Sequence, residues 1–444
     1  MARLRPFRGI RYNPDRISSM ADVISPPYDV ISETEQAELH GRSPYNVIRM
    51  ELGQKRPGDD RHDNPHTRAG NYLRTWVKDG TLVQEETPAV YLTATEFETV
   101  RGTYTRWGLM VSVGLEPFHQ GGILPHERTY SKVKSERLAL MQACQANLSP
   151  IFAFFSDDRS TMPQLISHVA HTAPVVAFQD DNQHRHKMWA IKDPDLHALI
   201  ATNFEQQTLF IADGHHRYET ALAYRDELAG LEGGLPGDHP ANDTLMYLSS
   251  IQDPGLMILP AHRLLPKVPS DVRRKFLEQA QAYFEVQSME DHVGKEGAVD
   301  ALMNKLEQTL PGAALAVALR GVEMPVLLQL KPGKKETIYP AETPDILKDI
   351  DVTLLTEFIF PALLGLSQTQ LDDVNCVHYH HDARTALGRV TSGQYDMAFI
   401  IKPTPIASVQ RIADAGRVMP RKSTYFAPKV ITGLVMHALA TTMD

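Results

Sequence analysis

A short apolar segment that passes through a turn directly into a helix is the feature that most restricts how this chain can fold. Residues 209–211 (Leu-Phe-Ile) are suited to a buried strand, and Asp213-Gly214 marks a turn. Residues after the turn recur at helical spacing, so a helix is predicted from His215. This strand–turn–helix unit indicates a fold that contains both sheets and helices.

Strand and helix patterns alternate along the rest of the chain. Residues 67–79 have helical periodicity, residues 88–115 favour antiparallel strands, and residues 149–155 favour a buried strand. The apolar residues 313–330 are interrupted by charges and a proline, which predicts two core strands around a turn. Because the elements follow no regular βαβ rhythm, we predict an α+β fold class with mixed sheets and packed helices.

Charge and cysteine content limit the classes of function. The 444 residues carry a net charge of −9 with a pI near 6.1, so nucleic acid is not an expected partner. Cys144 and Cys376 form no CxxC pair, so neither a disulfide framework nor a cysteine zinc site is predicted. Neither a signal peptide nor a membrane span is evident, which predicts a cytoplasmic protein. The oligomeric state stays open.

The residues around the turn indicate an anion-binding site. The first N–H groups of a helix have no intrahelical partner, and the helix dipole adds partial positive charge there. Gly214 lets a ligand approach the backbone closely, and His215, His216 and Arg217 add side-chain donors. We therefore predict that the loop from Asp213 to Arg217 holds phosphate.

Two simpler interpretations of the loop are open at this stage. Asp213 is suited to the N-cap of the helix, where it would accept from the N–H of His216. Capping alone does not account for two histidines and an arginine on the same first turn. A metal site is the other interpretation, but adjacent side chains on a helix diverge by about 100°, so His215 and His216 are poorly placed to chelate one ion.

Several segments resemble the uncharacterised bacterial and archaeal family called domain of unknown function 1015. The matching pieces are spread over nearly the full length of the chain. They are residues 27–32, 125–127, 147–152, 211–222 and 420–426. This resemblance implies no activity by itself.

The sequence from Asp213 to Arg217 also resembles the phosphate-binding signature of the ParB/sulfiredoxin-like superfamily. Some members of that superfamily are kinases that phosphorylate free serine with ADP or ATP. A His-Glu pair at 126–127, a helix, and a Pro-Ile strand start at 150–151 follow in a similar order. The resemblance implies that Glu127 is the general base, that Asp213 orients the hydroxyl or a Mg²⁺ ion, and that residues 214–217 hold the phosphates.

The chain length predicts two or three domains. We place an N-terminal α+β domain at residues 1–115 and a C-terminal α+β domain at residues 266–444. Between them, residues 116–265 form a central ParB/sulfiredoxin-like, phosphate-binding domain. The long spacing inside this domain predicts an insertion at about residues 157–205.

Other basic residues are candidates for binding a nucleotide. Near Glu127 these are His126, Arg128 and Lys132, and near the C-terminus they are Arg421 and Lys422. A solvated charged face and a salt-bridged tail are the alternatives for the two groups.

Weaker candidates lie elsewhere. Tyr28 and Asp29 in a proline-fixed loop, and Asn147, are candidates for substrate binding, with a structural turn as the alternative. The histidines at 378–381 are interpreted as a surface cluster rather than a metal site.

These residues favour a small-molecule kinase as the function. The acceptor would be the hydroxyl of a metabolite such as serine, with ATP or ADP as the donor and Mg²⁺ neutralising charge. A nucleotide-binding ParB-like switch protein and a metal-dependent hydrolase are the alternatives.

Overall fold

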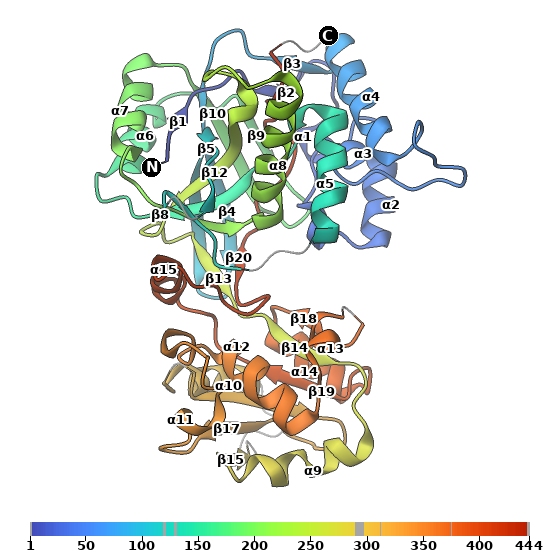
Figure 1. The fold of residues 1–444 in the computed structure, drawn as a ribbon, viewed down its shortest axis with the longest axis vertical. Coiled ribbons are helices and arrows are strands. Elements are labelled where there is room, and N and C mark those ends of the chain that lie inside the picture. The colour runs from blue at the N-terminus through green and yellow to red at the C-terminus, as the bar shows by residue number, and fades with distance from the viewer. Residues whose placement is uncertain are drawn as a thin grey trace. The chain divides into compact units, whose positions relative to one another are not determined.

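The computed structural model describes residues 2–118, 121–127, 131–288, 297–310, 312–373 and 375–441, and the side chains at 131–134 and 298 lie outside the description. The chain forms two compact units (Figure 1). Unit 1 consists of residues 1–125, 129–257 and 428–444, and unit 2 of residues 126–128 and 258–427.

Unit 1 contains the elements that precede residue 257 and one that follows residue 428. Its strands are β1 (Leu4–Arg5), β2 (Ile10–Tyr12), β3 (Leu82–Gln84), β4 (Val90–Thr99), β5 (Gly102–Gly114), β6 (Ile123–Leu124), β7 (Ala146–Asn147), β8 (Ile151–Phe155), β9 (Val176–Gln179), β10 (Arg185–Ile191), β11 (Leu209–Asp213), β12 (Asp243–Ser250) and β21 (His437–Ala438). Its helices are α1 (Met20–Val23), α2 (Glu33–Arg42), α3 (Ile48–Glu51), α4 (Pro65–Lys78), α5 (Ser131–Cys144), α6 (Thr161–Val169), α7 (Pro194–Phe204) and α8 (His215–Glu232), with 3₁₀ turns at Tyr28–Val30 and Pro240–Asn242.

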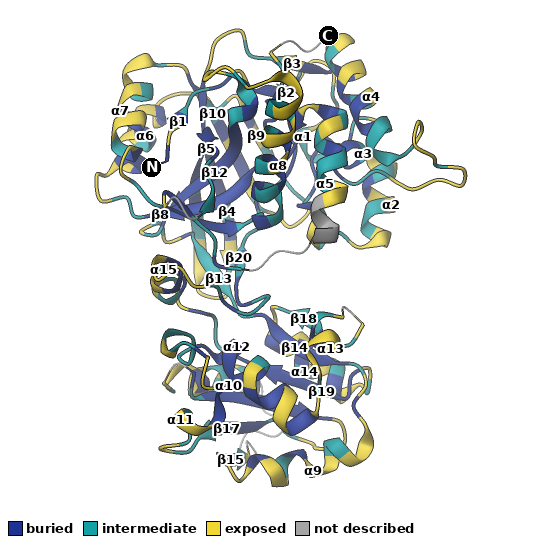
Figure 2. Ribbon diagram, viewed as in Figure 1, coloured by how far each residue is buried: buried dark blue, intermediate teal, exposed yellow. Residues whose placement is uncertain are grey.

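A mixed sheet forms the centre of unit 1. Within the described residues it has nine strands, in the order β6-β11-β8-β12-β5-β4-β10-β9, with β1 also paired to β5. β8 and β12 run parallel, as do β6 and β11, whereas the other described pairs in this sheet are antiparallel. β8 and β12 are buried along their whole length, as the dark blue strands of Figure 2 show.

Helices α6, α7 and α8 pack on the same apolar face of this sheet. α6 and α7 contribute Leu165 and Phe204 to the apolar cluster beneath the sheet, and α8 contributes Tyr218. α4, α5 and α8 pack side by side in that order (Figure 1). α4 begins where its sequence requires, because Asn64 and Thr67 form a reciprocal capping box ahead of it.

Unit 2 is built on a smaller sheet. Its strands are β13 (Met257–Leu259), β14 (His262–Leu265), β15 (Phe284–Ser288), β16 (Ala314–Leu319), β17 (Val326–Leu330), β18 (His378–His380), β19 (Met397–Ile400) and β20 (Tyr425–Ala427). Its helices are α9 (Ser270–Ala280), α10 (Ala298–Glu307), α11 (Lys335–Ile338), α12 (Asp351–Thr353), a π-helical segment Leu354–Leu363, α13 (Gln368–Asp372), α14 (Ala383–Thr391) and α15 (Ile406–Asp414), with a 3₁₀ turn at Asp345–Leu347. In the described part, six strands follow the order β15-β17-β16-β19-β14-β18, and β13 pairs with β20.

The mixed α+β class predicted from the sequence is confirmed, but the expected division into three domains differs from the structure. β5 ends at the expected 115/116 boundary, yet it pairs with β12, so residues 1–115 and most of 116–265 share one sheet. Residues 428–444 return to unit 1 rather than staying in a C-terminal domain. The segment 157–205, expected as an insertion, supplies β9 and β10 at one edge of the same sheet.

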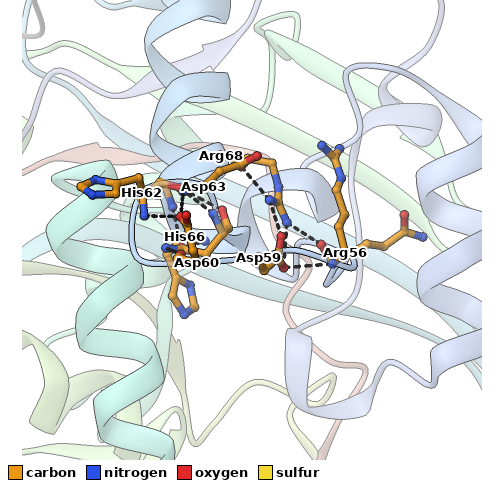
Figure 3. A network of polar contacts seen from close by, with 10 residues as sticks. Arg56, Asp59, Asp60, His62, Asp63, His66 and Arg68 are labelled. Carbon is orange, nitrogen blue, oxygen red and sulfur yellow. Dashed lines mark hydrogen bonds and ion pairs between the residues drawn. The ribbon is translucent and has the colours of Figure 1, made fainter.

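The polar loop between α3 and α4 is held by a network of charged side chains (Figure 3). Nη1 of Arg68 lies 2.7 Å from carboxylate oxygens of both Asp59 and Asp63. Oδ1 of Asp60 accepts from the backbone N–H groups of His62 and Asp63 at 2.7 and 2.9 Å. This loop is therefore ordered by its own charges rather than by apolar packing.

In the part of the chain that the structure describes, no helix combines the length and the apolar character that a membrane crossing requires.

Candidate phosphate-binding site

The predicted loop lies where β11 passes into α8. β11 ends at Asp213, Gly214 has a φ of 93°, and α8 begins at His215. The N-cap position therefore belongs to Gly214, which has no side chain, so Asp213 is not the helix N-cap. The positive φ explains the glycine, because other residues rarely adopt this conformation.

Arg217 folds back over the first turn of α8. A Cβ atom placed on Gly214 would lie 2.9 Å from Nε of Arg217, so the absence of a side chain at Gly214 is what gives the guanidinium its place. Nη1 of Arg217 donates to the carbonyl oxygen of Pro150, at the start of β8. Nε of Arg217 is buried and has no hydrogen-bond partner among the described residues. A buried donor without a partner is costly, and a bound anion would satisfy it.

Asp213 is flanked by two cations. Nζ of Lys429 lies 3.0 Å from Oδ2 of Asp213, and Nη2 of Arg217 lies 3.9 Å from Oδ1. The three side chains are only 11–18% exposed, so their charges are weakly screened. Among themselves these three side chains, one carboxylate and two cations, carry one net positive charge.

A second charged group lies close to the loop, on α3 and α5. Glu51 is buried, and its Oε1 lies 3.0 Å from both Nη1 of Arg137 and Oγ of Ser149. The guanidinium of Arg137 stands over the ring of Tyr28, 4.2 Å from its centroid. The candidate Tyr28 thus contacts a buried ion pair rather than forming an isolated turn.

The two groups border one pocket within unit 1. It has a cavity volume of about 40 Å³. Arg217 and Thr220 of α8 line it, together with Glu51, Arg137 and Asn147. Asn147 also has a structural role, since its Oδ1 accepts from the backbone N–H of Leu245 at 2.9 Å and so ties β7 to β12.

The pKa values reflect this crowding of charge. Burial alone lowers the pKa of Arg217, but Asp213, with smaller effects from Tyr28, Asp29 and Glu51, raises it above its ordinary value. Burial raises the pKa of the Tyr28 hydroxyl to about 12, against the opposing effect of Arg217 and Arg137. Arg217 is therefore a permanent cation beside a neutral phenol.

The other predicted residues lie in unit 2. His126 is buried, its Nε2 lies 3.0 Å from Oγ1 of Thr424, and its carbonyl oxygen accepts from the N–H of Met419 at 2.8 Å. Glu127 forms a parallel β-bridge with Met419. The His-Glu pair and the basic segment near 420 are almost 300 residues apart in sequence, and the fold of unit 2 brings them together.

Buried Arg263 holds the turn of this basic segment. Its Nη2 donates to the carbonyl oxygens of Arg421 and Lys422 at 3.3 and 2.9 Å. Lys422 has a φ of 55°, and Oγ of Ser423 donates to the carbonyl oxygen of Pro420 at 2.5 Å. The negative charge of Glu127 acts on Arg263, although burial is the larger effect and lowers the pKa of Arg263.

The structure therefore divides the predicted site residues between the units. The 213–217 loop, Tyr28, Asp29 and Asn147 belong to unit 1. His126, Glu127, Arg421 and Lys422 belong to unit 2. The pairing of Glu127 with the loop stays a prediction. Arg128 and the side chain of Lys132 lie outside the described residues.

The sequence marked Lys429 as part of the basic stretch that contains Arg421 and Lys422, but it predicted neither the pairing of Lys429 with Asp213 nor the role of Glu51. Lys429 is 216 residues from Asp213, and no local pattern pairs them. Glu51 is a lone carboxylate between the apolar residues Met50 and Leu52, a pattern that indicates a buried acid. Its partners Arg137 and Ser149 are distant in sequence, so the sequence could not identify them.

The histidines at 378–381 have neighbours other than metal ligands. Nδ1 of His378 lies 2.6 Å from the hydroxyl of Tyr395, and His381 stacks on Tyr425. Their interpretation as a surface cluster rather than a metal site stays a prediction.

Comparison with known proteins gives a family but no activity. No curated protein matches the sequence. Similar solved structures include a conserved hypothetical protein from Pyrococcus furiosus, with 14% identity and a TM-score of 0.31 over 70% of this chain and 92% of that chain. A free serine kinase in complex with AMP has 11% identity and a TM-score of 0.32, over 70% and 89% of the two chains. SbnI from Staphylococcus aureus, truncated at its C-terminus, has 9% identity and a TM-score of 0.35, over 73% and 85%.

Because these TM-scores are low, the similarities assign neither a ligand nor an activity to this chain. The family comparison is stronger, since the match covers residues 4–353. The chain belongs to the family described as "Protein of unknown function (DUF1015)".

Proposed function

We propose that this chain is a nucleotide-dependent phosphotransferase that acts on the hydroxyl of a small metabolite such as serine. The loop from Asp213 to Arg217 would hold the phosphates of ATP or ADP. Phosphoryl transfer requires mainly positioning and the neutralisation of negative charge, which are the properties that a cationic helix N-terminus provides.

The observation that carries the proposal is the state of Arg217. Its guanidinium is nearly buried, is placed by a glycine at positive φ, and keeps one N–H donor without a protein partner among the described residues. A purely structural arginine would be expected to use all its buried donors. A phosphate oxygen at Nε of Arg217 would complete its hydrogen bonding.

The surroundings of Asp213 bear on the role of Mg²⁺. Lys429 and Arg217 already neutralise this carboxylate, so a magnesium ion bound to it would be repelled by two neighbouring cations. We therefore propose that Mg²⁺ enters with the nucleotide, bound to its phosphates, and that Asp213 positions Lys429 and Arg217. Bound Mg²⁺ would neutralise charge on the transferring group.

In the proposed reaction a carboxylate removes the proton of the acceptor hydroxyl. The hydroxyl oxygen then forms a bond to the terminal phosphorus, and the bond from that phosphorus to the bridging oxygen breaks. The products are a phosphorylated metabolite and a nucleotide with one phosphate fewer. Glu127 is the candidate base through its sequence resemblance, and Glu127→Gln tests that role separately.

Calorimetric titration of ATP, ADP and inorganic phosphate, with Mg²⁺, tests the binding half of the proposal. Wild type is compared with Arg217→Ala, with Arg217→Lys, and with the control Arg16→Ala, which removes an exposed arginine of the same unit. We expect both Arg217 variants to lose micromolar binding, because neither alanine nor lysine has the guanidinium fork. The control should bind as wild type does. Equal binding by all four proteins would remove the loop from the proposal.

Detection of phosphorylated products by mass spectrometry tests the catalytic half. Serine is the first acceptor, followed by other hydroxy amino acids and hydroxy acids. Asp213→Asn separates two roles of this residue. If Asp213 only positions Lys429, the variant keeps measurable turnover, whereas a reacting carboxylate would lose it entirely. Nucleotide binding without transfer to any acceptor would refute the phosphotransferase and leave a nucleotide-binding protein.

A further inference from the structure

A cluster of three side chains of the metal-ligand type lies at the hairpin between β9 and β10, outside the 213–217 loop. The turn of this hairpin is closed by backbone hydrogen bonds, from the N–H of Asp180 to the carbonyl of His184 and from the N–H of Gln183 to the carbonyl of Asp180, both 3.0 Å long. Oδ1 of Asp180 accepts from the N–H of His184 at 2.9 Å. The turn is thus satisfied by the backbone and by one oxygen of Asp180.

The other oxygen of Asp180 faces two imidazoles. Oδ2 lies 2.9 Å from Nε2 of His186 and 3.5 Å from Nδ1 of His184. The three candidate ligand atoms all lie within 4.8 Å of one another. Around one zinc ion with bonds of about 2.0–2.1 Å, ligand atoms in a tetrahedron are roughly 3.3 Å apart. Small side-chain rotations would therefore place all three on one ion.

Neighbouring strands of the sheet hold the side chain of His186 in place. His186 is 4% exposed and pairs in register with Thr95 of β4 and Phe178 of β9. Its second ring nitrogen, Nδ1, lies 3.2 Å from Oγ1 of Thr95, and its ring stacks on Phe178. A hydroxyl or carbonyl on the far nitrogen is the usual support for a metal-binding histidine, because it fixes the ring and the tautomer.

The front of the cluster borders a pocket. Asp180 and His184 line a pocket of about 440 Å³ within unit 1, together with residues of α2 and with Pro428, Lys429 and Ile431 of the returning segment. A metal ion held by the cluster would have three protein ligands, with its remaining positions directed at this pocket. Three protein ligands and an accessible position are typical of exchangeable or catalytic sites, whereas structural zinc sites have four.

We propose that Asp180, His184 and His186 form a binding site for a divalent transition-metal ion, of the class of Zn²⁺ or Fe²⁺. Two imidazoles and one carboxylate suit these borderline ions better than Mg²⁺ or Ca²⁺, which prefer oxygen ligands. None of the three ligand residues belongs to the 213–217 loop, although Lys429, which pairs with Asp213, lines the same pocket.

The alternative is that the cluster only closes the hairpin through hydrogen bonds. Oδ1 of Asp180 already closes the hairpin by accepting from the N–H of His184. Closure of the hairpin therefore does not explain why two imidazoles approach Oδ2. Among the described residues, Asp180, His184 and His186 are the group whose ligand atoms lie close enough together to hold one metal ion.

Metal titration of the full chain tests the site. The protein is purified without a histidine tag, freed of metal with a chelator, and titrated with Zn²⁺ and Co²⁺. We expect one equivalent to bind wild type, with visible absorption bands for Co²⁺. Asp180→Asn preserves the acceptor of the turn but removes the anionic ligand, so affinity is expected to fall by at least about tenfold. His184→Ala should do the same.

The matched control is His168→Ala, which removes an exposed histidine of α6 and is expected to bind metal as wild type does. Circular dichroism checks that each variant is folded. X-ray absorption of the Zn²⁺-loaded wild type provides a second readout, for which we expect scattering from two imidazoles. Binding that is absent in wild type, binding that is unchanged in both Asp180→Asn and His184→Ala, or a spectrum without imidazole scattering would each overturn the proposal.

Discussion

The glycines of α8 and its two ends allow the geometry of the phosphate loop to be tested through stability. Gly214 has a φ of 93°, and a Cβ there would lie 2.9 Å from Nε and 3.0 Å from Cζ of Arg217. Gly214→Ala should therefore have two effects. The backbone is strained, and the guanidinium must move away from its hydrogen bond to Pro150.

The expected magnitude follows from these two effects. A left-handed backbone costs about 1–2 kcal/mol for a residue with a Cβ. Loss of a buried hydrogen bond from a charged donor costs about 1.5–3 kcal/mol. Gly214→Ala should thus lower the free energy of unfolding of unit 1 by about 2.5–5 kcal/mol. In an Arg217→Ala background only the backbone part should remain, about 1–2 kcal/mol.

Two other glycines of this helix are matched controls. Gly233, the C-cap, has a φ of 71° with nothing within 4 Å of its Cβ position, so Gly233→Ala isolates the backbone cost. Gly230 is exposed inside α8 with equally open surroundings, so Gly230→Ala should stabilise by roughly 0.5–1 kcal/mol. Urea denaturation followed by tryptophan fluorescence is the assay, since all three tryptophans of the chain lie in unit 1.

The reasoning fails if Gly214→Ala costs no more than Gly233→Ala. It also fails if the cost of Gly214→Ala is the same with and without Arg217, because the two residues would then not be coupled.

Further predictions concern the buried groups of unit 1 and its metal cluster. Burial lowers the pKa of His437 to about 4, so the unfolded chain binds its proton first and stability falls as the pH drops from about 6.5 through 4. This loss should total about 3 kcal/mol and disappear in His437→Gln, as measured by urea denaturation at a series of pH values. Glu51→Ala should cost about 3–5 kcal/mol in the same assay because it leaves Arg137, whose side chain is only 11% exposed, without its carboxylate partner, and Glu51→Leu combined with Arg137→Met should recover most of this loss. Zn²⁺ at about 100 times its dissociation constant should add about 2.7 kcal/mol to the stability of unit 1, and a chelator should reverse this.

Local sequence patterns correctly predicted those helices and strands whose formation depends on residues close together in the sequence. The strand, turn and helix around Asp213-Gly214 are found as β11 and α8, and the expected helix at 67–79 is α4. The two strands expected within 313–330 are β16 and β17, which pair antiparallel. Each of these depends on neighbours within a few residues, such as the glycine at the turn or the capping box before α4.

The domain boundaries could not be predicted in the same way. Whether β5 closes one domain or continues a larger sheet depends on its pairing with β12, about 130 residues later. The metal cluster was missed for a related reason. His184 and His186 stand close together in sequence, but the supporting Thr95 comes from β4 and is set by sheet register.

The returning C-terminal segment changes what the loop motif can do. It is tied into unit 1 by bridges between Ile10 and Met436 and between Ser25 and Thr432, and by the pairing of β21 with β7. These ties place Lys429 beside Asp213.

Without Lys429, Asp213 and Arg217 would cancel each other's charge, and the loop would offer an anion little beyond its backbone N–H groups. With Lys429, two cations face one carboxylate in a weakly screened position, an arrangement that suits the proposed phosphate. The short motif is therefore incomplete by itself, and we expect the proposed phosphate binding to depend on a lysine 216 residues away.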